Sequence, residues 1–438
     1  MRIIKCIWLL VLLSIGQPAL SSTFDIFGYN PRAMGLGGAL TGGTHDYTAS
    51  YYNPAALTSQ KKVNLGLGLS FTAPALFVDR TSEESIHPTV LPESHGGLNF
   101  GWKYPVGGIL RKQVALGISL HVPFGRLLRV QGFEPTSPQF YLYQNLHDKL
   151  LLITALAYEP VPWLSVGVGV QTLANLSGSA DLRLDVIDST FESAEAEVDV
   201  LPSGGPIVAV HARPAPWVQL GFTFRGSTSL LFELPVGVHV SEALALDIAM
   251  RQVVLWAPDQ MVFGARFDVP EWRLGVGVDL AYSRWSAAPD PSTRIAIDFR
   301  GKLLRGTGTD EVLDVGTGAP NIELQFVDTL TPRVGIEWRA TPNFIVRTGY
   351  FFRPTPAPRA TGTAMYLDND AHVVSLGGGF GIGDHLELGV GPVEVDMAIQ
   401  ATILARRTVL RVGVNDPIGN ISHGGVLWTA SLACSYRY

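Results

Sequence analysis

The sequence predicts an all-β membrane protein, a transmembrane antiparallel barrel of about fourteen strands whose N-terminal segment plugs the lumen. Three observations predict this fold. The chain starts with a secretory signal, most of the rest alternates apolar with small or polar residues, and short turns alternate with long polar connections. Beyond the signal, no apolar run reaches the roughly 20 residues of a spanning helix, and lipid admits only helices and closed barrels.

Residues 1–21 are predicted to be a signal peptide. Arg2 and Lys5 supply the positive start, Ile7 to Ile15 form the apolar core, and cleavage is expected after Ser21. The alternative is an uncleaved membrane anchor. We favour cleavage because the apolar run is shorter than a spanning helix.

Composition narrows the possible functions. The net charge of −6 and the scattered basic residues argue against a nucleic-acid partner. Of the two cysteines, Cys6 leaves with the signal and Cys434 remains alone, so no intrachain disulfide is expected. The histidines are dispersed, and His121 and His372, at or near strand ends, are expected to be polar lining and not ligands or bases.

No enzyme activity, cofactor or metal site is expected. The sequence contains no Gly-x-Ser-x-Gly elbow, no His-Glu-x-x-His and no phosphate-binding loop. A lipase-like or protease-like barrel is the alternative, and it would need a Ser or Asp/His cluster at the outer rim.

A period of two predicts the strands. It is clearest in residues 63–71, 114–122, 164–170 and 274–282, where one face is apolar and the other is small or polar. A soluble β-sandwich would alternate in the same way. The second face carries mostly Gly, Ser, Gln and Asn instead of Lys and Glu, which indicates a lumen and not a solvated surface.

Short turns set the number of strands. Four strands begin directly after a proline followed by an aromatic residue, at Pro160 to Trp163, Pro214 to Trp217, Pro270 to Trp272 and Pro342 to Phe344. Such rings suit the periplasmic membrane interface. With two weaker turns, at Pro105 to Gly108 and Gly381 to Asp384, there are six periplasmic turns. If both termini lie on the periplasmic side, six such turns require seven outer loops and fourteen strands.

The barrel is assigned to residues 61–438. The strands are expected near residues 62, 96, 112, 150, 163, 204, 217, 259, 272, 331, 344, 372, 392 and 427. The last strand places Leu432, Cys434, Tyr436 and Tyr438 on one face. This terminal aromatic face fits a signal for the barrel-assembly machinery and also a strand that closes the barrel, and the two interpretations are compatible.

Residues 22–60 are predicted to form the plug. Five glycines, Gly35, Gly37, Gly38, Gly42 and Gly43, fall in nine positions and allow close backbone packing. A flexible linker is the alternative, but the segment also contains apolar and aromatic anchors that a linker lacks: Met34, Leu36, Leu40, Tyr47, Tyr51, Tyr52 and Leu57.

Within the plug, Asn53-Pro54 is interpreted as a hinge or strut beside a lateral opening, or else as an ordinary turn.

Residues Arg32 to Leu57 resemble the N-terminal hatch of the FadL/TodX family of outer-membrane transporters for hydrophobic compounds. The matching motifs are Met34-Gly35-Leu36-Gly37-Gly38-Ala39, the following Asp46, and Asn53-Pro54-Ala55. Weaker matches along the barrel include Val122-Pro123-Phe124-Gly125, Tyr282-Ser283-Arg284-Trp285 and Arg347-Thr348-Gly349-Tyr350.

The resemblance implies a fourteen-stranded barrel in the Gram-negative outer membrane, in contact with lipid and lipopolysaccharide and monomeric. It also implies uptake of long-chain fatty acids or other hydrophobic molecules. The ligand would be captured at the outer loops, pass into the barrel and leave sideways where a strand is kinked near Asn53-Pro54-Ala55. Gly35, Gly37 and Gly38 would belong to the hatch or gate.

The loop from about Pro123 to Leu150 is the candidate for first capture of ligand. Ser137-Pro138 is a helix start, and Leu142, Leu146 and Leu150 would form an apolar stripe. This stripe is either exposed for ligand or folded over the barrel mouth and buried against other loops. The apolar candidates for ligand contact are Phe124, Leu127, Leu128, Phe133, Phe140, Tyr141 and Tyr143.

Arg225 occupies an inward position and could pair with a ligand carboxylate. The alternative is a structural ion pair with a barrel acid such as Asp279 or Glu337. Aromatic hydrocarbons, which need no cation, remain a possible cargo. A general porin or a structural barrel is the alternative function. The acidic stretch from Asp181 to Asp199 is expected to be a solvated outer hairpin, or a divalent-ion bridge to lipopolysaccharide.

Overall fold

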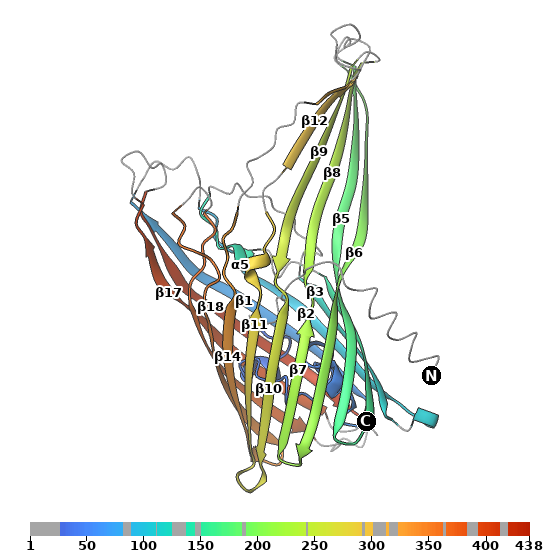
Figure 1. Ribbon diagram of the computed structural model, residues 1–438, viewed down its shortest axis with the longest axis vertical. Coiled ribbons are helices and arrows are strands. Elements are labelled where there is room, and N and C mark those ends of the chain that lie inside the picture. Colours follow the sequence, from blue (N-terminus) through green and yellow to red (C-terminus); the bar gives the residue numbers. More distant parts are fainter. Residues whose placement is uncertain are drawn as a thin grey trace.

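The computed structural model describes residues 27–81, 89–110, 112–124, 137–144, 150–185, 190–241, 244–290, 294–300, 312–314, 323–361, 365–382, 393–411 and 419–438. The predicted signal peptide lies outside these residues. The described strands form one eighteen-stranded sheet, and fourteen of them close into an antiparallel barrel (Figure 1). Closure is made between the first and last strands, which pair from Asn64 with Arg437 to Arg80 with Ile421. The barrel is therefore confirmed.

The barrel strands in chain order are β1 (Asn64–Arg80), β2 (His95–Val106), β3 (Val114–Pro123), β4 (Leu151–Val161), β5 (Leu164–Asp185), β6 (Thr190–Ala215), β7 (Val218–Arg225), β10 (Gln260–Val269), β11 (Leu274–Ser283), β14 (Thr329–Thr341), β15 (Phe344–Arg353), β16 (Ala371–Ile382), β17 (Val393–Val409) and β18 (Ile421–Arg437). Every predicted strand position falls inside one of these strands or within two residues of it.

The two faces of the barrel wall are chemically opposite. Along β18, Thr429 and Ser431 are buried toward the lumen, while Trp428 and Leu432 are about half exposed on the outer face. The same division holds around the barrel, where the exposed large side chains are apolar and many buried ones are polar. A soluble protein has the reverse arrangement, so the outer face is built for lipid. The chain is an outer-membrane barrel that crosses the bilayer many times.

The four proline-aromatic turns are present at one end of the barrel, whereas the predicted turn at Gly381 to Asp384 runs outside the described residues. Trp163, Trp217, Trp272 and Phe344 stand between 41% and 71% exposed beside these turns. Both barrel termini lie at the same end, because the Val63 amide donates to the Tyr438 carbonyl over 3.0 Å. Exposed rings at this level match the aromatic girdle of a membrane interface.

Part of the sheet extends beyond the barrel at the opposite end (Figure 1). There β5 and β6 form the predicted hairpin, and β5 also pairs in parallel with β8. The additional strands were not predicted, since their segments were expected to be polar connections. They are β8 (Thr228–Ser241), β9 (Leu244–Ala257), β12 (Arg294–Arg300) and β13 (Val312–Asp314).

The described part of the N-terminal region, residues 27–60, is here called the inner segment. It contains α3 (Pro31–Gly35), α4 (Ala49–Tyr52) and the 3-10 helix η1 (Pro54–Thr58), all of them buried. It lies within the barrel, where α3 packs on β15 to β18 and η1 on β2 to β6 (Figure 1).

The other helices in the described residues are short: η2 (Gly108–Leu110), α5 (Tyr141–Gln144), η3 (Pro270–Trp272) and η4 (Trp285–Ala287). None of the helices in the described ranges has the length and apolar character needed to span a bilayer.

Candidate functional site

Glycines bring the inner segment against the barrel wall. Gly37 and Gly38 adopt φ values of +58° and +72°, which L side chains rarely take. A Cβ on Gly37 would come within 2.9 Å of the Tyr350 amide nitrogen, and one on Gly35 within 3.2 Å of the Gly377 Cα. These glycines therefore serve both turning and close packing.

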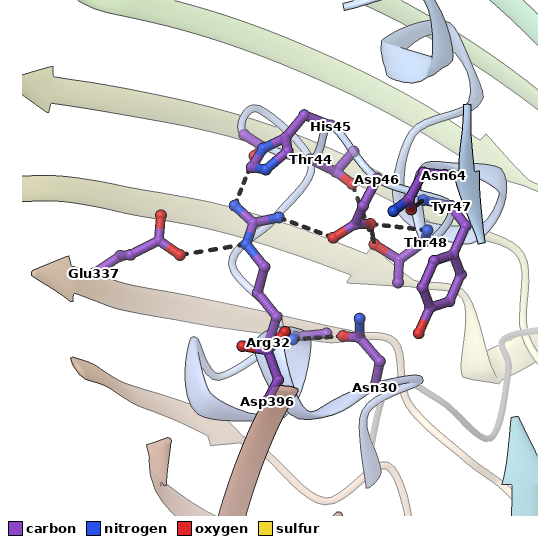
Figure 2. Close-up of polar contacts among 12 residues, drawn as sticks. Asn30, Arg32, Thr44, His45, Asp46, Tyr47, Thr48, Asn64, Glu337 and Asp396 are labelled. Atoms are coloured by element: carbon purple, nitrogen blue, oxygen red, sulfur yellow. Dashed lines mark hydrogen bonds and ion pairs between the residues drawn. The ribbon is translucent and has the colours of Figure 1, made fainter. Parts of the chain in front are cut away.

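Arg32 links the two halves of the inner segment to the wall (Figure 2). Its guanidinium donates to the Asp46 carboxylate over 3.4 Å, to the Glu337 carboxylate on β14 over 3.3 Å and to the Gly43 carbonyl over 3.3 Å. Asp46 also accepts the Thr48 amide over 2.9 Å. Burial alone would raise the pKa of Asp46, but the Arg32 charge, with help from neighbouring donors, lowers it to about 2.

Arg32 belongs to a larger group of paired charges in the lumen. Glu337 also accepts from Arg347 over 2.8 Å and from Arg266 over 2.9 Å, and Arg347 pairs with Asp396. We call Arg32, Asp46, Arg266, Glu337, Arg347 and Asp396 the charge network. Buried charges need such partners, because a lone buried charge is costly. The network fixes which strands the inner segment faces.

The charge network was not predicted from the sequence, although the sequence contains a signal for its members. Arg266, Glu337, Arg347 and Asp396 each stand on the polar face of an apolar alternating strand. A charge at a lumen position requires an opposite charge nearby. The alternation could have identified these charged lumen residues. It could not have shown which of them pair, because the paired residues lie on strands far apart in sequence.

The Asn53-Pro54-Ala55 motif joins the inner segment to β5, β6 and β7. The Asn53 amide donates to the Thr41 carbonyl over 2.8 Å and to the Val210 carbonyl on β6 over 3.1 Å. Its side-chain oxygen accepts the Ala55 amide over 3.1 Å and so caps η1. A Cβ on Gly167 of β5 would come within 2.3 Å of the Ala55 nitrogen. The motif is thus buried and hydrogen-bonded to the wall, and its role as a hinge or strut stays a prediction.

Two of the strands that the Asn53-Pro54-Ala55 motif contacts, β5 and β6, pair without a register shift from Leu164 and Ala212 to Arg183 and Ser193. The kinked strand that the resemblance implies near this motif stays a prediction.

Arg225 is buried at the end of β7, above the inner segment. Its guanidinium donates to the Tyr51 carbonyl over 2.9 Å, hydrogen-bonds Gln260 and lies 4.5 Å from the centre of the Tyr51 ring. The expected ion pair with Asp279 or Glu337 is not the arrangement that forms. Asp279 accepts the amides of Leu40 and Thr41, and Glu337 binds the arginines of the charge network.

Aromatic side chains cover the outer mouth of the barrel. Successive ring centroids lie 5.2 to 6.2 Å apart, in edge-to-face geometry, from Trp256 through Trp285, Phe326 and Tyr141 to Tyr366. We call these five residues the mouth cluster. They come from five outer segments that are far apart in sequence, so their apolar surface forms only in the folded barrel.

Buried polar groups hold the loops of the mouth together. Arg353 pairs with the Asp368 carboxylate over 2.8 Å and also donates to the Tyr143 hydroxyl. Gln139 exchanges backbone hydrogen bonds with Met365 and Leu367, at 3.1 and 2.8 Å. The loop containing α5 is therefore tied to the loop that precedes β16.

These contacts place the predicted capture residues. Phe140 and Tyr143 are fully buried, Tyr141 is partly buried, and Phe124 is half exposed. Leu127, Leu128 and Phe133 lie outside the described residues. The described part of the predicted helix is α5, Tyr141–Gln144, and Leu146 lies outside the described residues. Of the two alternatives, the described part matches the loop folded over the mouth.

Comparisons with known proteins agree with this architecture. No protein-family model matches the chain. The alkane uptake protein A of Marinobacter nauticus is 23% identical over 429 residues, which cover 90% of this chain and 87% of that protein.

Solved structures share the fold. A Pseudomonas aeruginosa FadL homologue superimposes with a TM-score of 0.60 at 14% identity, covering 96% of this chain and 99% of that one. The Pseudomonas putida toluene transporter TodX gives 0.55 at 15% identity, with 97% and 99% covered. The resemblance is confirmed at the level of the fold: the chain has the closed antiparallel β-barrel fold of these proteins.

Proposed function

We propose that the protein is an outer-membrane channel for the uptake of hydrophobic small molecules, long-chain fatty acids or hydrocarbons. The mouth cluster is the observation that carries this proposal. It places five aromatic rings over the entrance of a barrel whose inner wall is largely polar. A mouth of this composition suits an apolar ligand, because aromatic surface gains from burial against apolar groups. The relatives described above, named for alkane uptake and toluene transport, support the same class of cargo.

The route begins at the mouth cluster and passes Arg225 and the inner segment. The inner segment acts as the hatch, and Asn53-Pro54-Ala55 holds it against β5 and β6. Movement of this strut would open the path toward the wall or the periplasm. Gly35, Gly37 and Gly38 keep the other side of the hatch on β14 to β16, since larger residues would collide there.

The charges of the lumen favour uncharged hydrocarbons over carboxylates. Arg225 is already engaged by Tyr51 and Gln260, and Arg353 by Asp368. A fatty-acid head group would have to displace these partners. A hydrocarbon needs no cation and leaves the polar contacts intact.

Ligand binding by the purified protein tests the proposal. Native mass spectrometry would follow binding of hexadecane, toluene and oleate to the wild type, Trp285→Ala and Arg225→Ala. We expect Trp285→Ala to weaken hydrocarbon binding about tenfold, because a ring contributes about 1 kcal/mol or more. Trp163→Ala removes an exposed ring at the periplasmic turn and is the matched control. Arg225→Ala should affect oleate alone. Failure of all three ligands to bind the wild type would contradict the proposal.

The alternative of a general porin is tested in liposomes. The inner segment fills the lumen with buried side chains, which supports exclusion of polar solutes. Liposome swelling in sugars should therefore be no faster with the wild type than with empty liposomes.

We infer further that the chain acts as a non-enzymatic monomer and reaches the barrel-assembly machinery through β18. The stacked Tyr436 and Tyr438 at its end, 5.4 Å apart, support a terminal aromatic signal. The relatives named above as transporters support a role without catalysis. Contact with lipopolysaccharide at the outer loops completes the proposal.

A further inference from the structure

The lipid-facing wall formed by β15, β16 and β17 has a side-chain-sized gap. Gly378 on β16 points outward, between Leu376 and Phe380 on its own strand. Its cross-strand partners are Val346 on β15 and Met397 on β17. A groove of about 450 Å³ lies over this glycine. Its size falls within the range of about 300 to 1,000 Å³ that is usual for small-molecule sites.

The backbone does not require a glycine at this position. The φ of Gly378 is not positive, and an added Cβ would make only ordinary contacts, 3.7 Å to Phe344 and 3.8 Å to the Ile345 carbonyl. The neighbouring glycines differ. A Cβ on Gly379 would come within 2.5 Å of the Asp396 carboxylate, and one on Gly377 within 3.2 Å of Gly35. Packing explains those two residues, whereas Gly378 leaves space on the membrane side.

The groove is apolar and open to the bilayer. Leu376, Phe380 and Met397 are 52% to 58% exposed, and they stand beside a floor of backbone. Phe344 follows the periplasmic turn directly, and Val346 lies two residues further, about 7 Å along the strand. The groove therefore opens into the leaflet that faces the periplasm. An empty slot here would lose dispersion contacts, so a flexible apolar chain is the group that fits it.

The apolar chain that fits the groove does not reach it from the lumen, because the barrel wall is closed here. β16 pairs without a register shift with β15 from Phe344 to Arg353 and with β17 from Val393 to Leu404. Behind the groove, α3 closes the inner face, where Gly35 meets Gly377. The groove is instead continuous with the surface that surrounding lipid covers.

We propose that this groove is a binding site for one acyl chain of a phospholipid in the periplasmic leaflet. The chain lies over Gly378 between Val346 and Met397, with Leu376 and Phe380 at its two ends. The site is separate from the uptake path and gives the barrel a fixed lipid contact outside the hatch.

Photo-cross-linking in nanodiscs tests the site. The probe is a phosphatidylethanolamine with a diazirine on one acyl chain, and labelled peptides are located by mass spectrometry. We expect labelling to concentrate on the peptides that contain Leu376 to Phe380 and Met397. Gly378→Leu fills the gap and should reduce this labelling about fivefold, a loss of affinity typical of a few lost contacts.

Thr154→Leu is the matched control, because Thr154 faces lipid on β4, outside the groove. It should leave labelling of the groove unchanged. If Gly378→Leu does not fold, Gly378→Ala, which the space accommodates, should still lower labelling about twofold. Labelling spread evenly over the lipid-facing strands, or unchanged in a folded Gly378→Leu protein, would overturn the proposal. Complete competition by hexadecane would assign the groove to cargo and would also overturn it.

Discussion

Asp46 shows how a single buried carboxylate can report on the inner segment. Its charge faces the Arg32 guanidinium at 3.4 Å, and both side chains are nearly inaccessible to solvent. A buried ion pair of this kind contributes less to net stability than to the choice of one arrangement, because desolvation opposes the attraction. Arg32 also reaches Glu337, so the pair fixes the inner segment to β14 as well as to itself.

The Asp46 pair predicts a defined pH dependence. The folded-state pKa is about 2, below the unfolded value of about 3.9, so the ionised form stabilises the fold above pH 4. This contribution is lost as the pH falls from about 4 to about 2. Asp46→Asn should lower the free energy of unfolding by about 2 kcal/mol at pH 7, and the difference from wild type should vanish near pH 2.

Urea unfolding in detergent micelles, followed by tryptophan fluorescence at pH 7, 4 and 2, measures this difference. Asp79→Asn is the control, because Asp79 and its partner Arg406 are about two-thirds exposed. We expect less than about 0.5 kcal/mol there. A difference for Asp46→Asn that persists at pH 2 would show that the carboxylate charge is not its cause.

At the scale of elements, pairs of glycines in neighbouring strands make room for the inner segment. Gly66 on β1 pairs with Gly101 on β2, and the Tyr47 ring lies close against both. A Cβ at either glycine would fall within 2 Å of a ring atom. The small face of these alternating strands is therefore shaped for a particular aromatic residue and is not simply a polar lining.

We predict that Gly101→Ala forces the Tyr47 ring out of place and lowers the free energy of unfolding by about 1 to 3 kcal/mol. In Gly101→Ala combined with Tyr47→Ala, the clash is removed, so the two effects should not add. The same urea titration measures both. Gly107→Ala is the control, since an added Cβ there meets no heavy atom within 4 Å. Full additivity would argue against the close contact.

At the scale of the whole molecule, the path through the barrel is closed twice. The mouth cluster covers the outer end, and the inner segment fills the lumen beneath it. A fourteen-stranded wall without this filling would enclose an aqueous channel. The two closures can therefore be separated by removing one at a time.

The wild-type barrel should not conduct ions in planar bilayers. Deletion of residues 30–57 should give large stepwise ion conductance. The double variant Trp285→Ala, Phe326→Ala opens only the mouth. It should not conduct ions, because the inner segment still fills the lumen. Conductance of this double variant equal to that of the deletion would place the ion barrier at the mouth instead.

Much of the barrel could be predicted because its signals are local. Alternation follows from the geometry of a strand between lipid and lumen, and the proline-aromatic turns mark one membrane interface. The outer extension of the sheet was not predicted, because β8 and β9 lie in segments that were expected to be loops. The inner segment could be recognised from its glycines and motif residues, but Arg225 could not be paired correctly. Its partners, Tyr51 and Gln260, are 174 and 35 residues away.

The sequence by itself determined the class of the protein: a barrel of about fourteen strands, the orientation of its two faces and a glycine-rich N-terminal segment. These follow from residue type and spacing, which act within a few residues. Only the tertiary structure decided which charges pair, which rings form the mouth cluster, and where Gly378 leaves a gap in the wall. These depend on the register between strands and on loops that meet across the barrel, where contacts are made between residues that have no fixed separation along the chain.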